Sequence, residues 1–467
     1  MSTPQRLQEL EELGELGQWA VEHILGLTVE NVQLKKQLEQ AQAQLKKQEE
    51  QLEQLQRQVH RQAAPFRRPE NERNPHPMRP GRKAGHAGFY RPKPDQVDEH
   101  IRVNLECCPH CQGALCEKRP LTQYIEEIPA VRPRVTELIT EEGWCEHCQA
   151  EVFSTHPLQV SRAGGAAAVQ LGPRALGLAC DLTKAKGLSM RKTVAVLGDH
   201  FGLKLTPGGL ALLLQRVGRK MQPEYEQMAV QLRQSAVAHA DETGWWVGGP
   251  GWWLWVFTTS EMTFYVVIQS RAAAVALGVL GKDFAGVLVS DCLAIYDDLN
   301  PLQQKCYSHH LKAVSEACQS HPQHGEGYLL QVRALLRTAI CLKALQEGAE
   351  PQRFELCLGN LRLRAHALLD HPRAQAQEEK VRMRLWKQRD HLFTFLERSE
   401  VPATNNLAER QLRPAVIARK ISCGNKTSKG AQAWQVLASI SATCQQKGKS
   451  FIQFVAERVL LQPTRAP

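Results

Sequence analysis

One stretch in the second half of the chain most tightly constrains what it can fold into. It begins with a short β-rich run, Ala236–Asp241, that ends in a carboxylate. Two more apolar runs follow after glycine-containing turns, at 252–259 and 262–269, and then a helical stretch at 271–280. The run 286–291 is apolar on both faces, as buried parallel strands are, and it again ends in Asp. The pattern predicts three antiparallel strands, a helix and a parallel strand.

This order is that of a ribonuclease-H-like fold, in which the first and fourth strands are neighbours. Asp241 and Asp291 would then lie side by side at adjacent strand ends. Converging carboxylates repel unless a cation joins them, and sites for hard divalent cations are built in this way. Two-metal phosphoryl transfer needs a third carboxylate, and Glu409 is the candidate. We therefore predict that these three residues are catalytic and bind two Mg²⁺ (or Mn²⁺) ions.

Each of these carboxylates also has a purely structural interpretation. Glu409 lies three residues after Asn406, and a helix capped by this Asn would use the pair as a capping box. An Asp at the end of a strand is often only a turn former. The connection between Asp291 and Glu409 is much longer than a strand and helix require, and its helical patterns predict an all-helical insertion at about 320–400 within a catalytic core at 234–425.

The first 62 residues have a seven-residue apolar repeat. It runs from Ile24 to Val59 and places Asn31 at a core position, where a lone Asn favours two-stranded parallel pairing. We predict a leucine-zipper-like coiled coil over 1–62 that forms a homodimer or a higher oligomer. The alternative is a long solvated helix that folds back on the rest of the chain.

Residues 63–103 are predicted to be a basic, proline-rich linker. The stretch from Arg61 to Lys93 has six prolines and nine basic residues against two acidic ones, so it buries too little apolar surface to fold alone. Its compact cationic segment is a candidate for contact with the DNA minor groove, or else a solvated tether. The residues concerned are Arg79, Arg82 and Lys83.

Residues 104–156 contain two Cys-x-x-Cys pairs, each of which can supply two tetrahedral Zn²⁺ ligands. The pairs are Cys108 with Cys111 and Cys145 with Cys148. Stretches with strand character lie between them, at 124–128 and 134–140, so the pattern predicts a zinc ribbon with one structural Zn²⁺. Alternative ligands nearby are Cys107, His110 and His147.

Residues 157–233 are predicted to be helical, with helices at 173–184 and 189–200 and a third capped by Thr206. Their spacing is that of a helix-turn-helix, although the first turn of the third helix has no side chain that reads bases. The region is therefore either a DNA-binding module or structural packing. Its candidate phosphate contacts are Arg216, Arg219 and Lys220. The last segment, 426–467, is also predicted to be helical.

Charge and composition point to nucleic acid and away from membranes. The chain has 467 residues and a formal charge of +10, of which Arg61 to Lys93 contributes +7 and Asn405 to Gly430 contributes +5. No apolar run approaches the length of about 20 residues that spans a membrane. The 14 cysteines do not form a disulfide framework, which favours a reducing compartment. We expect a cytoplasmic protein, associated with the nucleoid when bound to DNA.

Several motifs together resemble the DDE transposases of the insertion-sequence-66 family. They are Ala240–Thr243, Val289–Asp291 with Tyr296, Cys306–His309, and Asn405–Arg410 followed by Arg413–Pro414 and Arg419–Lys420. The order of the predicted domains is also similar. There are two departures: Thr404 stands where the family usually has Asp, and Ser422–Asn425 replaces a more aromatic stretch. Neither removes a carboxylate of the triad.

The resemblance implies that Asp241, Asp291 and Glu409 are the metal-binding catalytic triad. Cys306 and His309 match a Cys-x-x-His signature beyond the second Asp, for which we expect a structural or supporting role. Among the basic residues of this half of the chain, the candidates for DNA contact are Arg410, Arg413, Arg419 and Lys420.

We therefore expect a transposase that binds the terminal inverted repeats of an insertion sequence in double-stranded DNA. It would cleave the 3′ ends and join them to target DNA, with or without accessory proteins of the same element. The alternative is a catalytically inactive DNA-binding or regulatory protein derived from a transposase. Five tryptophans in the predicted hairpin after Asp241 either pack in the core or stack on unpaired DNA bases.

Overall fold

The structure is a computed structural model that describes residues 85–460, except 89, 166–167, 298, 300–301 and 321–326, and seven positions between 33 and 44. It divides into two units, Met1–Ile125 and Glu126–Pro467. The seven early positions are helical and exposed, and the rest of the predicted coiled coil lies outside the described residues. So do Arg79, Arg82 and Lys83.

The predicted strands between the two cysteine pairs are absent, because 124–128 and 134–140 contain no strand. Ile125 and Val135 have 88% and 89% of their surfaces exposed, and strand-forming residues do not make a strand without a partner to pair with. The pairing that does form is a hairpin of β1 (Glu142–Cys145) and β2 (Ala150–Phe153), in which Cys145 faces Ala150. That part of the ribbon prediction is wrong.

Four helices open the main body of the second unit. They are α2 (Pro173–Lys184), α3 (Met190–Phe201), α4 (Pro207–Lys220) and α5 (Gln222–Arg233). The predicted starts of α3 and α4 are confirmed, since the side chains of Ser189 and Thr206 accept hydrogen bonds from backbone N–H groups in the first turn. The helices share a core with α13 (Ser428–Gln446) and α14 (Phe451–Arg458).

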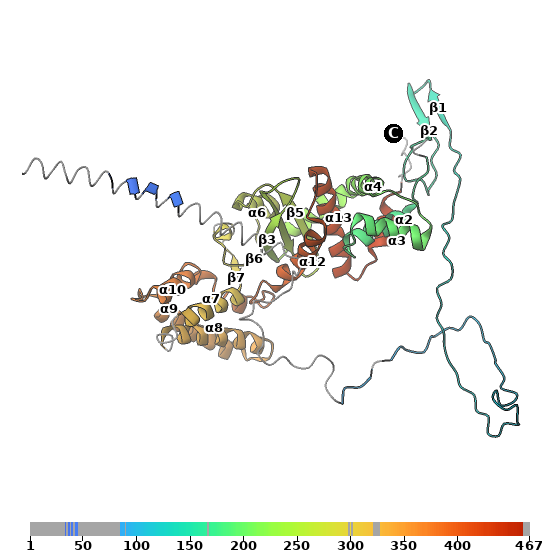
Figure 1. The fold of residues 1–467 in the computed structure, drawn as a ribbon. Coiled ribbons are helices and arrows are strands. Elements are labelled where there is room, and N and C mark those ends of the chain that lie inside the picture. The colour runs from blue at the N-terminus through green and yellow to red at the C-terminus, as the bar shows by residue number, and fades with distance from the viewer. Residues whose placement is uncertain are drawn as a thin grey trace, which may run out of the picture. The chain divides into compact units, whose positions relative to one another are not determined.

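A five-stranded sheet with the order β5-β4-β3-β6-β7 lies at the centre of this unit (Figure 1). Its strands are β3 (Val237–Trp245), β4 (Trp252–Thr258), β5 (Thr263–Ile268), β6 (Val287–Ser290) and β7 (Gln303–Lys305). The first three are antiparallel, whereas β6 and β7 run parallel to β3. The predicted pairing of the first and fourth strands is confirmed; β7 was not predicted.

Strand β3 continues four residues past Asp241, which therefore lies in mid-strand and not at a strand end as predicted. Side chains alternate between the two faces of a strand. Ala238 and Ala240 pack in the core that includes α6 (Ala273–Leu280), whereas Trp245 packs in the core that includes α12 (Asn406–Ser422) and α13. Asp241 lies four residues before Trp245, so the two side chains share one face of β3, the face that packs against α12.

The region from Tyr307 to Glu397, which overlaps the predicted all-helical insertion at about 320–400, contains helices and no strand among its described residues. Its helices are α7 (Tyr307–Ser320), α8 (Tyr328–Leu345), α9 (Pro351–Leu369), α10 (Ala376–Lys387) and α11 (Thr394–Glu397), with short 3₁₀ turns between them. They share a core with Val287 and Val289 of β6. In Figure 1 these helices gather beyond the β6–β7 edge of the sheet, away from α2–α4. Within the described residues, no helix has the length and apolar character needed to cross a bilayer.

Candidate active site

Three carboxylates from distant parts of the chain lie close enough to interact. Asp241 comes from the middle of β3, Asp291 follows β6 directly, and Glu409 lies in the first turn of α12. Burial, and then the charge of Asp291, raise the pKa of Asp241 to about 7, and the charges of Glu242 and Glu409 add to the effect. The Glu242 N–H, which donates to Asp241 Oδ1 at 2.8 Å, opposes it. The structure thus brings the three predicted catalytic residues together.

This donor set fits a hard divalent cation. Three carboxylates offer only oxygen ligands, which Mg²⁺ and Mn²⁺ prefer. Burial, and then repulsion between carboxylates, raise the pKa of Asp241, and a divalent cation would relieve that repulsion. Asp241, Asp291 and Glu409 are therefore the residues that could hold such ions.

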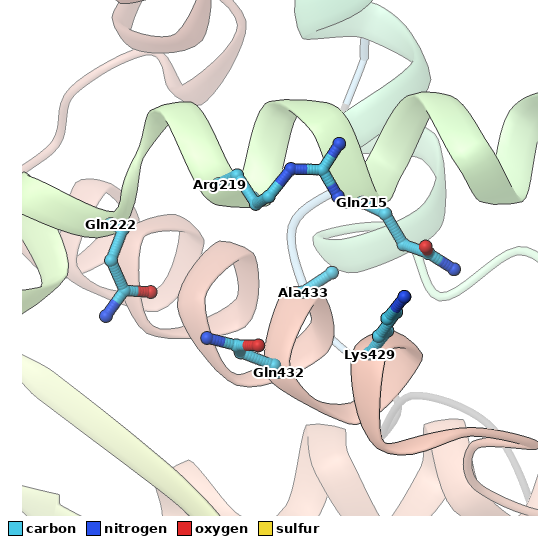
Figure 2. A pocket seen from close by; sticks show the side chains of 7 residues that line it. Gln215, Arg219, Gln222, Lys429, Gln432 and Ala433 are labelled. Atoms are coloured by element: carbon cyan, nitrogen blue, oxygen red, sulfur yellow. The ribbon is translucent and has the colours of Figure 1, made fainter.

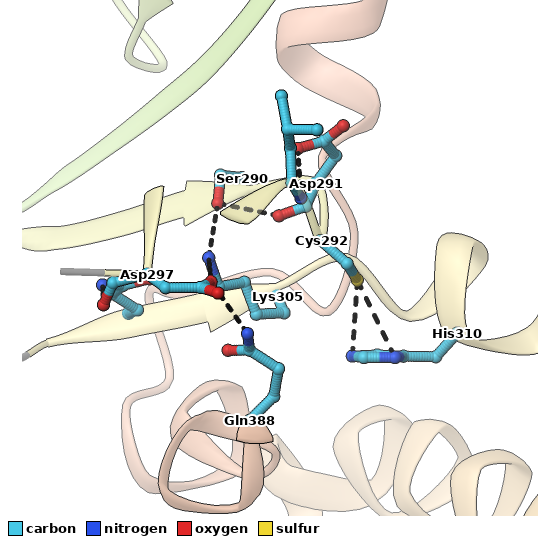
Figure 3. A network of polar contacts seen from close by, with 9 residues as sticks. Ser290, Asp291, Cys292, Asp297, Lys305, His310 and Gln388 are labelled. Atoms are coloured by element: carbon cyan, nitrogen blue, oxygen red, sulfur yellow. Dashed lines mark hydrogen bonds and ion pairs between the residues drawn. The ribbon is translucent and has the colours of Figure 1, made fainter. Parts of the chain in front are cut away.

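A polar network fixes the backbone that carries Asp291 (Figure 3). The Leu293 N–H donates to Asp291 Oδ1 at 3.0 Å, and the Ser290 hydroxyl donates to the Asp291 carbonyl at 3.0 Å. Lys305, which is fully buried, donates to Ser290 Oγ at 3.4 Å and pairs with Asp297 at 3.0 Å. The network holds β6 against β7 at the point where Asp291 leaves the sheet.

Cys306 and His309 lie beside Glu409. One ligand atom from each of the three lies within 4.8 Å of the others. Burial would raise the pKa of Cys306, but His309 and the Asn405 N–H together lower it below its usual value. Cys306, and then the charges of Asp291 and Glu409, raise the pKa of His309 against the effect of burial. This second set, with sulfur and nitrogen donors, suits a softer ion than the three carboxylates do.

Glu242, the sequence neighbour of Asp241, belongs to a different environment. Its side chain is 2% exposed and pairs with Arg271 at 2.9 Å. It also accepts a hydrogen bond from the Tyr296 hydroxyl. Because Glu242 faces the opposite side of β3 and its charge is compensated, it is not part of the carboxylate set.

Helix α12 does not begin with the capping box that its sequence allows. Its N-cap is Asn405, not Asn406, and no side chain caps the helix. The structural interpretation of Glu409 as a capping residue is therefore wrong. The side chain of Asn405 instead bonds to β3, a role that local sequence does not signal.

The basic residues of α12 divide into two groups. Arg410, Arg413 and Lys420 are exposed. Arg419 instead donates to Thr243 Oγ1 at 3.1 Å and to the Gly244 carbonyl, and burial lowers its pKa. Arg419 thus ties α12 to β3, and the exposed residues remain the candidates for DNA contact.

The basic residues of α4 also differ in their surroundings. Arg216 is exposed, whereas Lys220 donates to the Val160 carbonyl at 2.6 Å and the Val459 carbonyl at 2.5 Å, and burial lowers its pKa. Arg219 lines a pocket of about 240 Å³ between α4 and α13 (Figure 2). The other lining residues are mostly polar: Gln215, Gly218, Gln222, Lys429, Gln432 and Ala433.

The tryptophan hairpin is partly core. Trp245 and Trp255 are buried, and the Trp245 ring lies 4.7 Å from that of Trp434. Trp253 lies under the guanidinium of Arg271 at 4.4 Å. Trp246 is 44% exposed and has the largest exposed fraction of the five.

Each Cys-x-x-Cys pair forms a tight turn. In the first unit, the Cys108 N–H donates to the Gly113 carbonyl at 3.0 Å, and backbone N–H groups, that of Cys111 foremost, lower the pKa of the Cys108 thiol. In the second unit, the Cys148 N–H donates to Cys145 Sγ at 3.5 Å and lowers the pKa of that thiol. Each turn therefore favours a thiolate, the form that binds metal.

Comparison with known proteins gives two matches. A family model described as "Transposase IS66 family" matches residues 169–433, which is more than half of the chain. An uncharacterized protein of Sinorhizobium fredii, y4jO, is 33% identical over 81 residues, which are 17% of this chain and 25% of that protein. The chain thus covers about a quarter of the length of this curated relative. The family match spans all three candidate carboxylates.

Proposed function

Since the chain belongs to the transposase IS66 family, we propose that it is a DNA transposase that binds the terminal inverted repeats of an insertion sequence, cleaves the 3′ ends and joins them to target DNA. The observation that carries this proposal is the placement of Asp241, Asp291 and Glu409 on elements that pack together: β6 pairs with β3, and the N-cap of α12 is hydrogen bonded to β3. The strand order supports a ribonuclease-H-like catalytic core.

In this proposal the three carboxylates hold two Mg²⁺ or Mn²⁺ ions. When bound, such ions activate the attacking oxygen and stabilise the leaving oxygen of an in-line displacement. Asp241 must lose its proton to act as a ligand, and the Glu242 N–H stabilises the ionised form. The same residues serve cleavage, where water attacks, and joining, where a DNA 3′-hydroxyl attacks, so no covalent protein intermediate is required.

The distribution of positive charge supports a DNA partner. The segment from Asn405 to Gly430 carries six basic residues and one acidic residue, Glu409. We propose that two exposed residues of α12, Arg410 directly after Glu409 and Arg413 about one turn beyond it, contact phosphates near the cleaved bond. Arg219 and Lys429, which line the pocket between α4 and α13, are candidates for a second phosphate contact.

Two further parts of the proposal come from the sequence. The two cysteine turns together provide four thiolates for one structural Zn²⁺. The heptad repeat at the N-terminus joins two chains, which suits a reaction on the two ends of one DNA element.

The triad is tested by Asp241→Asn, Asp291→Asn and Glu409→Gln. Each substitution removes an ionised oxygen ligand while keeping the size of the side chain, so we expect loss of end cleavage in Mg²⁺ or Mn²⁺ with end binding within a few-fold of wild type. The matched control is Asp283→Asn, which changes an exposed Asp in the turn between α6 and β6. Binding is measured by mobility shift and cleavage on labelled element ends.

Cleavage that survives any one of the three substitutions would show the triad assignment to be wrong. If the wild-type protein binds element ends but does not cleave them in either metal, the inactive regulatory protein is the correct alternative.

A further inference from the structure

We propose that Asn405 is a positioning residue that sets the three candidate metal-binding carboxylates relative to one another. The inference rests on the proposed function, because it gives Asn405 a role in the same site. It assigns Asn405 no contact with DNA or metal. The argument follows from four hydrogen bonds that this one residue makes.

The side chain of Asn405 does not cap the helix that it precedes. An Asn at the N-cap usually accepts a hydrogen bond from the first turn of its helix, which is worth about 1 kcal/mol. Asn405 occupies the N-cap of α12 but makes no such bond. It is fully buried, with an exposed fraction of 0%. The helix therefore lacks a side-chain cap, and the Asn405 side chain makes its hydrogen bonds with other parts of the fold.

The side chain reaches the strand that carries Asp241. Asn405 Nδ2 donates to the Ala240 carbonyl at 2.8 Å, and Asn405 Oδ1 lies 3.1 Å from His239 Nδ1. Because the amide nitrogen is used at Ala240, the amide oxygen must accept, and His239 Nδ1 must carry the hydrogen. His239 and Ala240, the two residues before Asp241, are thereby fixed to the N-cap of α12.

The backbone of Asn405 reaches the segment that carries Asp291. The Asn405 N–H donates to Cys306 Sγ at 3.2 Å. The Cys306 N–H in turn donates to the carbonyl of Ser290, the residue before Asp291, at 2.9 Å. Cys306 is buried, and its sulfur is the acceptor that makes this link. The Cys-x-x-His signature thereby gains a physical role at its first position.

The fourth bond reaches Glu409 itself, whose backbone N–H donates to the Asn405 carbonyl at 3.2 Å. Asn405 is therefore bonded to the residue before Asp241 and to the first turn that holds Glu409, and it is linked through Cys306 to the residue before Asp291. Loss of the side chain would let α12 shift against β3, and a displacement of about 1 Å at a reacting centre can cost about 100-fold in rate.

The test compares Asn405→Ala with Asn406→Ala. Asn406 is the next residue, has the same side chain and is exposed, so its substitution controls for changes in helix α12 alone. For Asn405→Ala we expect end cleavage at saturating DNA to fall by about 10- to 100-fold, with an unchanged KM for DNA. Asn406→Ala should cleave within about 2-fold of wild type.

A second readout does not depend on activity. Calorimetric titration of Mn²⁺ into the DNA-free protein should show binding by wild type and Asn406→Ala, and binding weakened by about 10-fold in Asn405→Ala. Asn405→Asp guards against a variant that fails to fold, since it keeps the size of the side chain and the acceptor for His239. It places an oxygen against the Ala240 carbonyl, so it should lose cleavage and Mn²⁺ affinity in the same way.

The outcomes separate the two proposals. If Asn405→Ala and Asn405→Asp, with unchanged circular dichroism, cleave and bind Mn²⁺ as wild type does while Asp241→Asn is inactive, the positioning role is wrong and the triad stands. If Asp241→Asn also cleaves normally, the proposed function fails first. A lower melting temperature with unchanged Mn²⁺ affinity and unchanged cleavage would mean that Asn405 is structural only, and that too overturns the inference.

Discussion

At the scale of single residues, the alternation of a β-strand decides which acid can bind a metal. Asp241 and Glu242 are neighbours in the sequence, yet they point to opposite faces of β3. Glu242 meets Arg271 and the Tyr296 hydroxyl, which compensate its charge. Asp241 is buried near Asp291 and Glu409, and burial, followed by the charge of Asp291, raises its pKa. The sequence predicted Asp241 as the metal ligand, and the partners of the two acids across the fold give the physical reason.

The raised pKa of Asp241 predicts a pH-dependent stability of the metal-free protein. The folded state holds the proton up to a pH of about 7, whereas an ordinary Asp releases it near 3.8. This stabilisation is complete below pH 3.8 and is lost as the pH rises through 7, with a slope of up to about 1.4 kcal/mol per pH unit. Added Mg²⁺ or Mn²⁺ should stabilise the protein more above pH 7 than below it.

The measurement is urea unfolding of metal-free protein at several pH values between 5 and 8. Asp241→Asn, which cannot titrate, should show a flatter decline than wild type, and the exposed control Asp283→Asn should follow wild type. Parallel curves for wild type and Asp241→Asn would contradict a raised pKa at this residue.

At the scale of elements, α12 is held on β3 at both ends. Its start is fixed through Asn405, and its last turns through Arg419. Beyond the helix, Asn425 accepts from Trp245 Nε1 at 2.9 Å and donates its backbone N–H to the Trp246 carbonyl at 2.9 Å. The helix that supplies Glu409 is therefore fixed along the strand that supplies Asp241. The motif at 404–414 predicted the helix but not this double attachment.

The loop after α12 depends on a glycine. Gly424 has φ +91°, and a Cβ atom there would lie 2.4 Å from the Trp246 carbonyl oxygen. Gly424→Ala should therefore reduce the free energy of unfolding by about 1–3 kcal/mol in urea denaturation. Gly249→Ala in the facing hairpin is the control, because a Cβ atom there meets nothing within 4 Å. If the two variants have the same free energy of unfolding, the loop accommodates the added Cβ atom without loss of stability.

The sequence predicted the boundaries of helices correctly where the signal for them was local. Ser189 and Thr206 marked the starts of α3 and α4, because a capping hydroxyl acts within its own turn. The strand-like stretches at 124–128 and 134–140 were misleading, because a strand exists only with a partner. Strand β7 escaped prediction because its three polar residues, although buried, have no apolar pattern.

At the scale of the whole molecule, the two cysteine turns belong to different units of the chain, with Cys108 in one and Cys145 in the other. If both turns supply one Zn²⁺, either double substitution should remove the same ion. We therefore expect the variant Cys108→Ser/Cys111→Ser and the variant Cys145→Ser/Cys148→Ser each to lose one zinc per chain, measured by metal analysis of purified protein.

The control for the zinc experiment is Cys116→Ser, which changes an exposed cysteine of the first unit and should leave the zinc content unchanged. Combining the two double substitutions should cause no further loss of zinc. A larger loss in the combined variant would show that each turn binds an ion of its own.

The sequence by itself determined the first four strands of the five-stranded sheet and their pairing, the helices of the region after it, and the three carboxylates as candidates. It could do so because apolar period, capping residues and short motifs are local. Only the tertiary structure decided that Asp241 faces α12 while Glu242 is compensated, that Lys220 bonds to backbone carbonyls, and that Asn405 joins the segments around the site. Asn405 and His239 are 166 positions apart, and a hydrogen bond over that separation leaves no pattern in the sequence between them.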